Sequence, residues 1–225
     1  MTHVLVLTAV DVEARGLARH LGLARVERTP WPHYRAGALE IACVGVRAGR
    51  IEERVNACVP PDLLVSAGAC GALAPSLVTG DLVVPETVVS ADGGRHTTDA
   101  LPGLPRAGAL LTVADVVESV AAKARLWMET GAAAVDMESA LIVAWARSRG
   151  IRVAVVRGVS DTAADAVPAD LVALVDVGGR VSAGRAIRAA LARPSALADA
   201  MHLGRGTAAA LKTVAAALAR VARHG

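Results

Sequence analysis

The sequence has almost no aromatic side chains, with no phenylalanine, one tyrosine and three tryptophans among 225 residues. Proteins that bind single-stranded nucleic acid stack bases on aromatic side chains, so this shortage argues against that class. Hydrophobic residues nevertheless make up 54% of the chain. Alanine, valine, leucine and glycine must therefore fill the interior, which suits helices packed closely on a sheet.

A strong net charge and paired cysteines are also missing. The formal net charge is +3, from 24 basic and 21 acidic residues, and the arginines are scattered along the chain. We therefore expect no nucleic-acid partner. Cys43, Cys58 and Cys70 form no CxxC pair and have no histidine at ligand spacing. This pattern predicts neither a disulfide framework nor a metal site, and it favours a reducing cytoplasm.

No segment has the pattern of a secretory signal or a membrane span. The apolar run at residues 3–9 is far too short for a signal peptide, and glycine, serine and proline interrupt the uncharged stretch at 63–80. We therefore expect a cytoplasmic protein. The arginine-dotted, Ala/Leu-rich helix expected at 206–223 leaves two alternatives, of which packing in the core or a dimer is favoured over peripheral membrane contact.

Apolar runs alternate with helical patterns along the chain. We expect strands at 3–9, at 38–46, at the start of 62–75, at 80–91 with an interruption at Pro85, at 109–117 and at 152–161. A Gly-rich loop should complete 62–75, and a further loop should span 92–106. Helices are expected at 11–22, near 51–58, at 119–130, up to Gly150 and beyond residue 180. This order predicts one α/β domain over residues 1–225, with a largely parallel or mixed buried sheet.

Four unusual segments fall where strands are expected to end. They are Glu13, the "GACGA" run at 68–72, the "VDMES" run at 135–139, and the Ser-Asp pair at 160–161. In open α/β sheets the ligand crevice lies at the carboxyl ends of the strands. Buried carboxylates are costly unless they are partnered or used, so these acids are candidates for function. The G-x-x-G spacing alone matches neither the dinucleotide nor the phosphate fingerprint.

Each candidate also has a purely structural interpretation. Asp161 could be a helix N-cap, and Asp136 and Glu138 could complement a helix dipole as first-turn acids. Glu13 could lie on a solvated helix face, and Met137 could simply pack in the core. The residues alone leave these alternatives open.

Taken together, the segments resemble the purine nucleoside phosphorylase and nucleosidase superfamily. The resemblance covers residues 3–163 and rests on Glu13, "GALAPSLVTGDLVVP", "AVDMESA" and "VVRGVSDTA" in that order. It is strongest to the branch that cleaves methylthioadenosine and S-adenosylhomocysteine and to the related hopanoid-associated phosphorylases, and the tail at 167–197 is similar to the hopanoid-associated group. The resemblance implies a three-layer α/β/α domain with a central mixed sheet and a homodimer or larger homo-oligomer. It implies no metal and no organic cofactor, with inorganic phosphate as the alternative co-substrate.

The resemblance also implies three catalytic roles. Asp161 stands where the family acid protonates the purine at N7, and Glu138 where an acid grips the ribose hydroxyls and stabilises positive charge on the sugar. Glu13 matches the residue that positions the attacking water. A carboxyl group that protonates the purine works best with a raised pKa, and an apolar setting around Asp161 would raise it.

Further residues are expected to line the pocket. Met137 should lie against the ribose, Asp136 should support the site from the side, and Val117 should stand near the place of the aromatic that stacks on the purine in the family. The remaining expected substrate-binding residues are Ser160, Ala69, Cys70 and Gly71.

Two departures from the family pattern refine the hypothesis. Family phosphorylases carry arginines where this chain has Glu13 and Ser66, so water is favoured over phosphate unless Arg47, Arg50 or a partner subunit's arginine supplies the charge. With Val117 in place of an aromatic, purine stacking must be weaker or come from Trp127 or a neighbouring chain.

These features leave room for a bulky, apolar nucleoside. We expect an enzyme that cleaves an N-ribosidic bond and releases adenine, with adenosylhopane of hopanoid biosynthesis as substrate. The alternatives are a methylthioadenosine/S-adenosylhomocysteine nucleosidase, a purine nucleoside phosphorylase, and a non-catalytic nucleoside-binding module.

Overall fold

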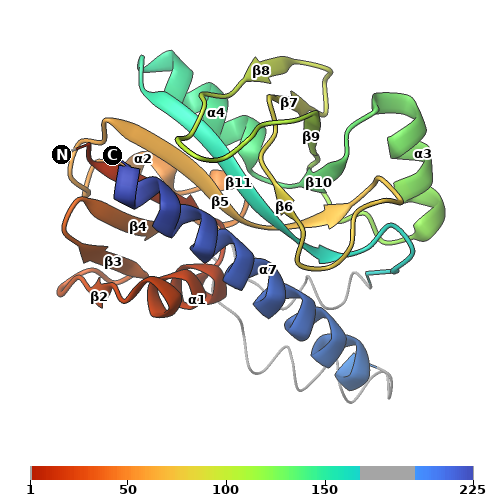
Figure 1. The fold of residues 1–225 in the computed structure, drawn as a ribbon, viewed down its shortest axis with the longest axis horizontal. Helices are drawn as coiled ribbons and strands as arrows, with labels where there is room; N and C mark the ends of the chain where they lie inside the picture. Colours follow the sequence, from red (N-terminus) through yellow and green to blue (C-terminus); the bar gives the residue numbers. More distant parts are fainter. Residues whose placement is uncertain (1, 168–195, 225) are drawn as a thin grey trace.

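A mixed β-sheet forms the centre of the molecule in the computed structural model, which describes residues 2–167 and 196–224 (Figure 1). Its described strands are β1 (Val4–Thr8), β2 (Ala24–Arg25), β3 (His33–Ala36), β4 (Leu39–Cys43), β5 (Leu63–Ala72), β6 (Leu82–Val83), β7 (Thr87–Ser90), β8 (Arg95–Thr97), β9 (Ala109–Thr112), β10 (Ala134–Asp136) and β11 (Arg152–Asp161). The main path runs β2-β3-β4-β1-β5-β10-β9-β7-β8, and β11 pairs with β5 and β6.

The long strand β5 organises the sheet. It pairs in parallel with β1 and with β11, and its last residues pair antiparallel with β10. The apolar run that opens the chain forms β1, whose five residues are all buried, as expected for a strand covered on both faces. Because β5, β10 and β11 meet near Gly71, side chains from three distant parts of the sequence come together there.

Helices cover both faces of this sheet. They are α1 (Asp11–Leu21), the 3₁₀ turn η1 (Val46–Ala48), α2 (Ile51–Val55), α3 (Val120–Thr130), α4 (Ser139–Ser148) and α7 (Ala196–His224). Successive residues of β1 point to opposite faces, so Val4 and Val6 pack with α1 and α7 while Leu5 and Leu7 pack with the α2 and α4 side. These layers confirm the α/β class with a central mixed sheet.

The helix expected at 206–223 forms the second half of α7 and packs on β11. Its buried residues include Leu211, Val214 and Leu218, and Figure 1 shows the helix running beside α1. The backbones approach closely because β11 has a glycine there, and a Cβ at Gly158 would lie 2.5 Å from the carbonyl oxygen of Ala210. The apolar face of α7 is therefore covered by the sheet. None of the described helices combines the length and hydropathy that a membrane crossing requires.

Several boundaries differ from the sequence prediction. The expected Gly-rich loop at 68–72 is wrong, because these residues continue β5 and pair with β11 and β10. The short strands β2, β3 and β8 were not expected, and all three are partly or fully exposed. Helix α1 ends as predicted at Gly22, which adopts the left-handed conformation with φ of 67°. The helix expected at 180–194 lies outside the described residues.

Candidate active site

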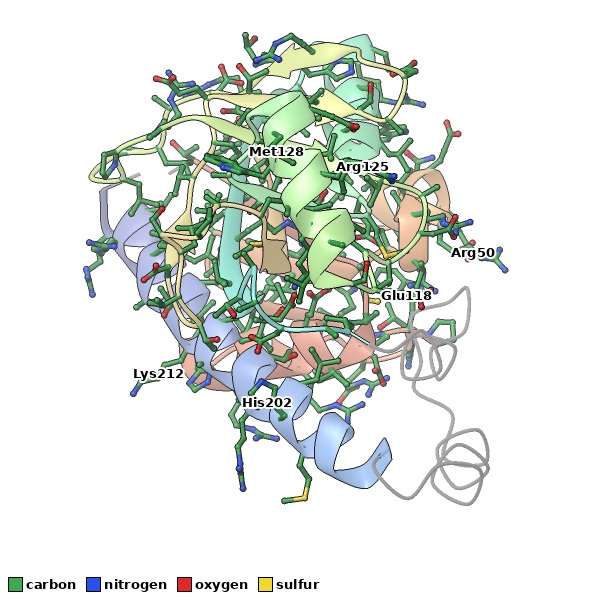
Figure 2. The ribbon with its side chains drawn as sticks, turned by 90° about the vertical axis from the view of Figure 1, so that its right-hand side faces the viewer. Arg50, Glu118, Arg125, Met128, His202 and Lys212 are labelled. Carbon is green, nitrogen blue, oxygen red and sulfur yellow. The ribbon has the colours of Figure 1, made fainter. Side chains whose placement is uncertain are left out.

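A cavity of about 180 Å³ opens at the carboxyl ends of β5, β10 and β11. It brings together nine of the ten residues that the sequence singles out: Ala69, Cys70, Gly71, Val117, Asp136, Met137, Glu138, Ser160 and Asp161. The tenth, Glu13, lies directly behind Ala69. Figure 2 views the molecule from this side, with α3 in front.

Two glycines of β5 make room for two charged side chains of β11. In the parallel register Gly68 lies opposite Arg157, and Gly71 lies opposite Asp161. A Cβ at Gly68 would come within 2.6 Å of Arg157 Nη1, and one at Gly71 within 2.9 Å of Asp161 Oδ2. The register also shifts between Val159 and Asp161, and such a bulge re-aims a strand's side chains. The glycines of the "GACGA" run are thus a spatial requirement of the site.

Asp161 lies in a polar setting rather than the apolar one expected from its strand. Its Oδ2 is 2.5 Å from Lys123 Nζ, and its Oδ1 accepts a hydrogen bond of 2.7 Å from Ser160 Oγ. The lysine is only 1% exposed and also donates to the carbonyl oxygen of Thr162 at 2.7 Å. The N-cap interpretation of Asp161 is wrong, because the described residues that follow it form a turn and no helix.

Glu138 stands at the N-cap position of α4, but its side chain caps nothing. Its Oε1 instead accepts a hydrogen bond of 3.1 Å from the backbone N–H of Arg47. Burial raises the pKa of Glu138 to about 7; the neighbouring carboxylates of Asp136 and Glu13 add to this shift, and Arg157 opposes it. A carboxyl group with this pKa can be neutral or ionised near neutral pH.

Asp136 interacts with the amino end of α4, a role that the sequence allows for both Asp136 and Glu138. Its Oδ2 accepts a hydrogen bond of 3.1 Å from the backbone N–H of Ser139 in the first turn of α4. Its other partners are Thr112 Oγ1 at 2.6 Å and Arg157 Nη2 at 2.9 Å. Asp136 is therefore fully engaged in holding the wall of the cavity.

Glu13 points inward from the first turn of α1, so the solvated-face interpretation is wrong. It is 5% exposed. Its Oε2 accepts hydrogen bonds from the backbone N–H groups of Ala9 and Val10, at 3.1 and 3.3 Å, and its Oε1 accepts one of 2.8 Å from that of Ala69. The last contact places the carboxylate against the wall of the cavity.

Arg157 and Lys123 are charged residues of this site that the sequence analysis did not assign. Arg157 is 1% exposed and donates to Ser66 Oγ at 2.8 Å, in addition to its ion pair with Asp136. Its position as the only charge in the apolar run 155–160 is a usable signal. Lys123 offered none, because a single lysine in a helix normally faces solvent.

The other expected contributors do not line the cavity, although Arg47 stands at its edge, where its backbone N–H bonds Glu138. Trp127 packs in the small apolar cluster beside α3 and is not among the residues that line the cavity. Arg47 pairs with Asp115 at 2.7 Å, and Arg50 projects from the surface beside Glu53 (Figure 2). Burial raises the pKa of the Cys70 thiol, which therefore stays protonated at neutral pH.

Comparison with known proteins decides the family. The model of the phosphorylase superfamily matches residues 45–107 and 104–193. The chain belongs to this superfamily. It is 30% identical over 224 residues to the futalosine hydrolase of Streptomyces coelicolor, with 80% of this chain and 95% of that protein covered.

Solved structures share the fold. The 5′-methylthioadenosine nucleosidase of Arabidopsis thaliana superposes with a TM-score of 0.70 at 19% identity, covering 98% of this chain and 96% of that one. The futalosine hydrolase of Helicobacter pylori superposes with a TM-score of 0.70 at 16% identity, covering 99% and 97%. The protein is an enzyme that cleaves N-glycosidic bonds, a reaction that needs no cofactor.

Proposed function

We propose that the enzyme hydrolyses the N-ribosidic bond of a purine nucleoside. Asp161 passes a proton to the purine base, and the adjacent ammonium group of Lys123 supplies that proton. Glu138 binds the ribose hydroxyls and stabilises the positive charge that develops on the sugar, and Glu13 orients the attacking water. The observation that carries the proposal is the convergence of these three acids, from α1, the start of α4 and the end of β11, on one cavity. Met137, which also lines the cavity, would lie against the ribose.

The charges around the cavity favour water as the acceptor. Among the residues that line it, Asp115, Asp136, Glu138 and Asp161 are acidic, and Lys123 is basic and already paired with Asp161. Arg157 lies behind this wall and is held by Asp136. A phosphate dianion would therefore meet carboxylates without a free arginine clamp among the described residues.

Adenosylhopane is the proposed substrate. Five valines, Val113, Val116, Val117, Val135 and Val167, give the cavity an apolar wall without an aromatic ring. This wall suits a nucleoside with an apolar substituent. The resemblance of the tail at 167–197 to the hopanoid-associated group also supports such a substrate. Futalosine is the second candidate, because the similar Streptomyces coelicolor protein is a futalosine hydrolase.

The test is product analysis with a panel of substrates. Adenosylhopane, futalosine and methylthioadenosine are incubated with the enzyme, with and without inorganic phosphate, and the free base and sugar products are separated by chromatography. We expect adenine release from adenosylhopane, independent of phosphate, with an unphosphorylated ribose that remains attached to the hopane. A phosphate requirement with a pentose 1-phosphate product contradicts hydrolysis, and preferential turnover of another nucleoside contradicts the substrate.

The panel also separates an enzyme from a non-catalytic binding module. A module would bind these nucleosides in calorimetry and return them intact. Asp161→Asn distinguishes the two further, because it should abolish base release while nucleoside binding remains.

A further inference from the structure

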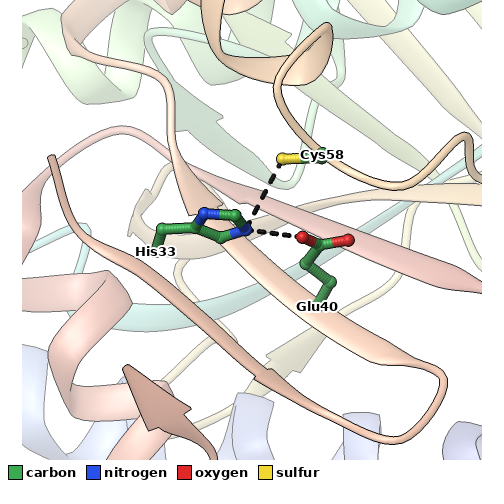
Figure 3. Close-up of side chains that lie close together, drawn as sticks. All are labelled: His33, Glu40 and Cys58. Atoms are coloured by element: carbon green, nitrogen blue, oxygen red, sulfur yellow. Dashed lines mark hydrogen bonds and ion pairs between the residues drawn. The ribbon is translucent and has the colours of Figure 1, made fainter. Parts of the chain in front are cut away.

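A second cluster of chemically active side chains lies in another part of the sheet from the cavity. His33 is on β3, Glu40 on β4, and Cys58 follows α2, and their ligand atoms all lie within 4.8 Å of one another (Figure 3). His3, just before β1, reaches the same carboxylate, with 2.9 Å between its Nε2 and Glu40 Oε2. In the sheet order, β3 and β4 are separated from β5 and β10 by β1.

We propose that these four side chains form a zinc site that fastens the β3–β4 edge of the sheet. Imidazole nitrogen, thiolate sulfur and carboxylate oxygen are the ligands that Zn²⁺ takes in proteins, and a structural site uses four of them. The sequence predicted no metal site, because its cysteines form no CxxC pair and have no histidine at ligand spacing, and residues 3, 33, 40 and 58 are far apart along the chain. Only the fold brings them together.

Charge balance supports a divalent ion at this place. Glu40 is completely buried, and its described hydrogen-bond partners are the two histidines and the backbone N–H of Val59. A buried carboxylate is costly without a compensating charge. One Zn²⁺ with two neutral imidazoles, the Glu40 carboxylate and a Cys58 thiolate makes a site of zero net charge.

The separations among His33, Glu40 and Cys58 are compatible with one shared ion, whereas His3, which contacts Glu40 from outside this group, must move toward the ion to become the fourth ligand. His33 Nε2 lies 2.5 Å from Glu40 Oε1 and 3.8 Å from Cys58 Sγ. Tetrahedral ligands about 2.0 to 2.3 Å from a zinc ion stand roughly 3.3 to 3.8 Å apart. The His33–Glu40 pair must therefore open by about 1 Å when the metal replaces the hydrogen bond between them.

The protons balance without any co-reactant. A carboxylate only accepts, so each histidine Nε2 now carries the proton it shares with Glu40. Coordination requires that proton on Nδ1, and His33 Nδ1 is buried with no hydrogen-bond partner among the described residues that would have to be broken. The Cys58 thiol releases its proton to solvent. Trp31 keeps the imidazole of His33 in place, since the two rings stack with centroids 4.7 Å apart.

The surroundings allow the ion to enter. The side chain of His3 is 13% exposed and Cys58 is half-buried, whereas His33 and Glu40 lie beneath them. An ion can therefore reach the two outer ligands first. Bound there, it would tie β3, β4, the segment after α2 and the segment before β1 to one point, which is the role of a structural zinc site.

Cobalt binding tests the site directly. Untagged full-length protein is stripped with a chelator and titrated with Co²⁺, and the thiolate-to-cobalt charge-transfer absorption is recorded. We expect one Co²⁺ per chain, with that absorption present in the wild type and displaced by Zn²⁺. Cys58→Ser should remove the absorption and weaken Zn²⁺ binding by about 100-fold or more.

Cys43→Ser is the matched control, because Cys43 is a buried cysteine and is not one of the four proposed ligands. It should keep the absorption. His3→Gln, at the more exposed edge, provides a variant with an intact thiol and should weaken Zn²⁺ binding while circular dichroism confirms that it folds. A wild-type protein without cobalt absorption, or absorption that survives Cys58→Ser, overturns the proposal.

Discussion

The ammonium group of Lys123 lies 2.5 Å from the carboxylate of Asp161, and both side chains are buried. A buried charge that loses its partner destabilises a protein strongly, because neither water nor a counter-ion replaces it. This ion pair therefore links the stability of the fold to Asp161, the proposed proton donor to the purine.

Lys123→Met should lower the free energy of unfolding by about 3 kcal/mol and should also reduce kcat. The measurement is urea denaturation together with base release. Lys212→Met, on the exposed side of α7 (Figure 2), should change neither quantity. The double variant Lys123→Met/Asp161→Asn should regain part of the lost stability, since it leaves no unpaired charge. Additive losses in the double variant contradict the coupling.

Asp161→Asn and Glu138→Gln should each lower kcat by about 100-fold or more. The first removes the proton donor for the base, and the second removes the anion that stabilises charge on the ribose. Glu53→Gln, an exposed carboxylate on α2, is the matched control and should retain the wild-type rate. Near-normal rates in both site variants would refute the assigned roles.

The pH profile should report the ionisation of Glu138. Its pKa of about 7 means that the proposed anionic form increases as the pH rises, so kcat/KM should rise with pH through about 7. This limb of the profile should disappear in Glu138→Gln. If the variant keeps the same limb, another group is responsible.

The free energy of unfolding should fall over the pH range in which kcat/KM rises. The pKa of Glu138 in the folded protein lies above its ordinary value of 4.5, so the folded state binds more protons than the unfolded chain between pH 4.5 and about 7. The contribution of Glu138 is fully present below pH 4.5 and is lost as the pH rises through about 7. Denaturation at several pH values should therefore show the wild type losing stability relative to Glu138→Gln across this range.

Gly68→Ala should impair the site through Glu13. The added methyl group would collide with the Glu13 carboxylate and with Arg157, so the proposed water-positioning group must move. A displacement of about 1 Å can cost on the order of 100-fold in rate, and we expect a fall in kcat of this size. Gly204→Ala, where nothing lies within 4 Å of the new methyl group, serves as the control. An unchanged kcat in Gly68→Ala would show that Glu13 takes no part in the reaction.

Gly158→Ala should destabilise the contact between β11 and α7. The new Cβ would lie 2.5 Å from the carbonyl oxygen of Ala210 and 2.7 Å from its Cα. Because both atoms are backbone, we expect a loss of about 1 to 3 kcal/mol in the free energy of unfolding. Gly204→Ala should instead be neutral or slightly stabilising within its helix. A thermal melt that places both variants at the wild-type midpoint contradicts this packing.

The sequence predicted which residues line the cavity better than it predicted the residues that support them. Glu138, Ser160 and Asp161 follow or end buried strands, and such strand ends meet at one edge of an α/β sheet. Glu13 resembled a solvated helix residue, and its inward orientation depends on backbone N–H groups that only the fold supplies. Lys123 could not be identified for the same reason, because its partners Asp161 and Thr162 are almost forty residues away.

The fold was predictable where residues are buried on both sides. The apolar runs of β1, β5 and β11 produced correct strands, whereas β2 and β8 are too short and too exposed to leave a hydrophobic pattern. The "GACGA" run was interpreted as a loop because glycine is rare in strands. Its glycines are tolerated in β5 because they accommodate the Asp161 and Arg157 side chains.

The packing of α7 on β11 has a consequence for biosynthesis. Every other described element precedes α7 in the chain, so the ribosome delivers this helix after the sheet that it covers. Until then the strand that bears Asp161 exposes one apolar side to the crowded cell. The nascent sheet therefore needs either rapid completion of translation or a chaperone to protect it from aggregation.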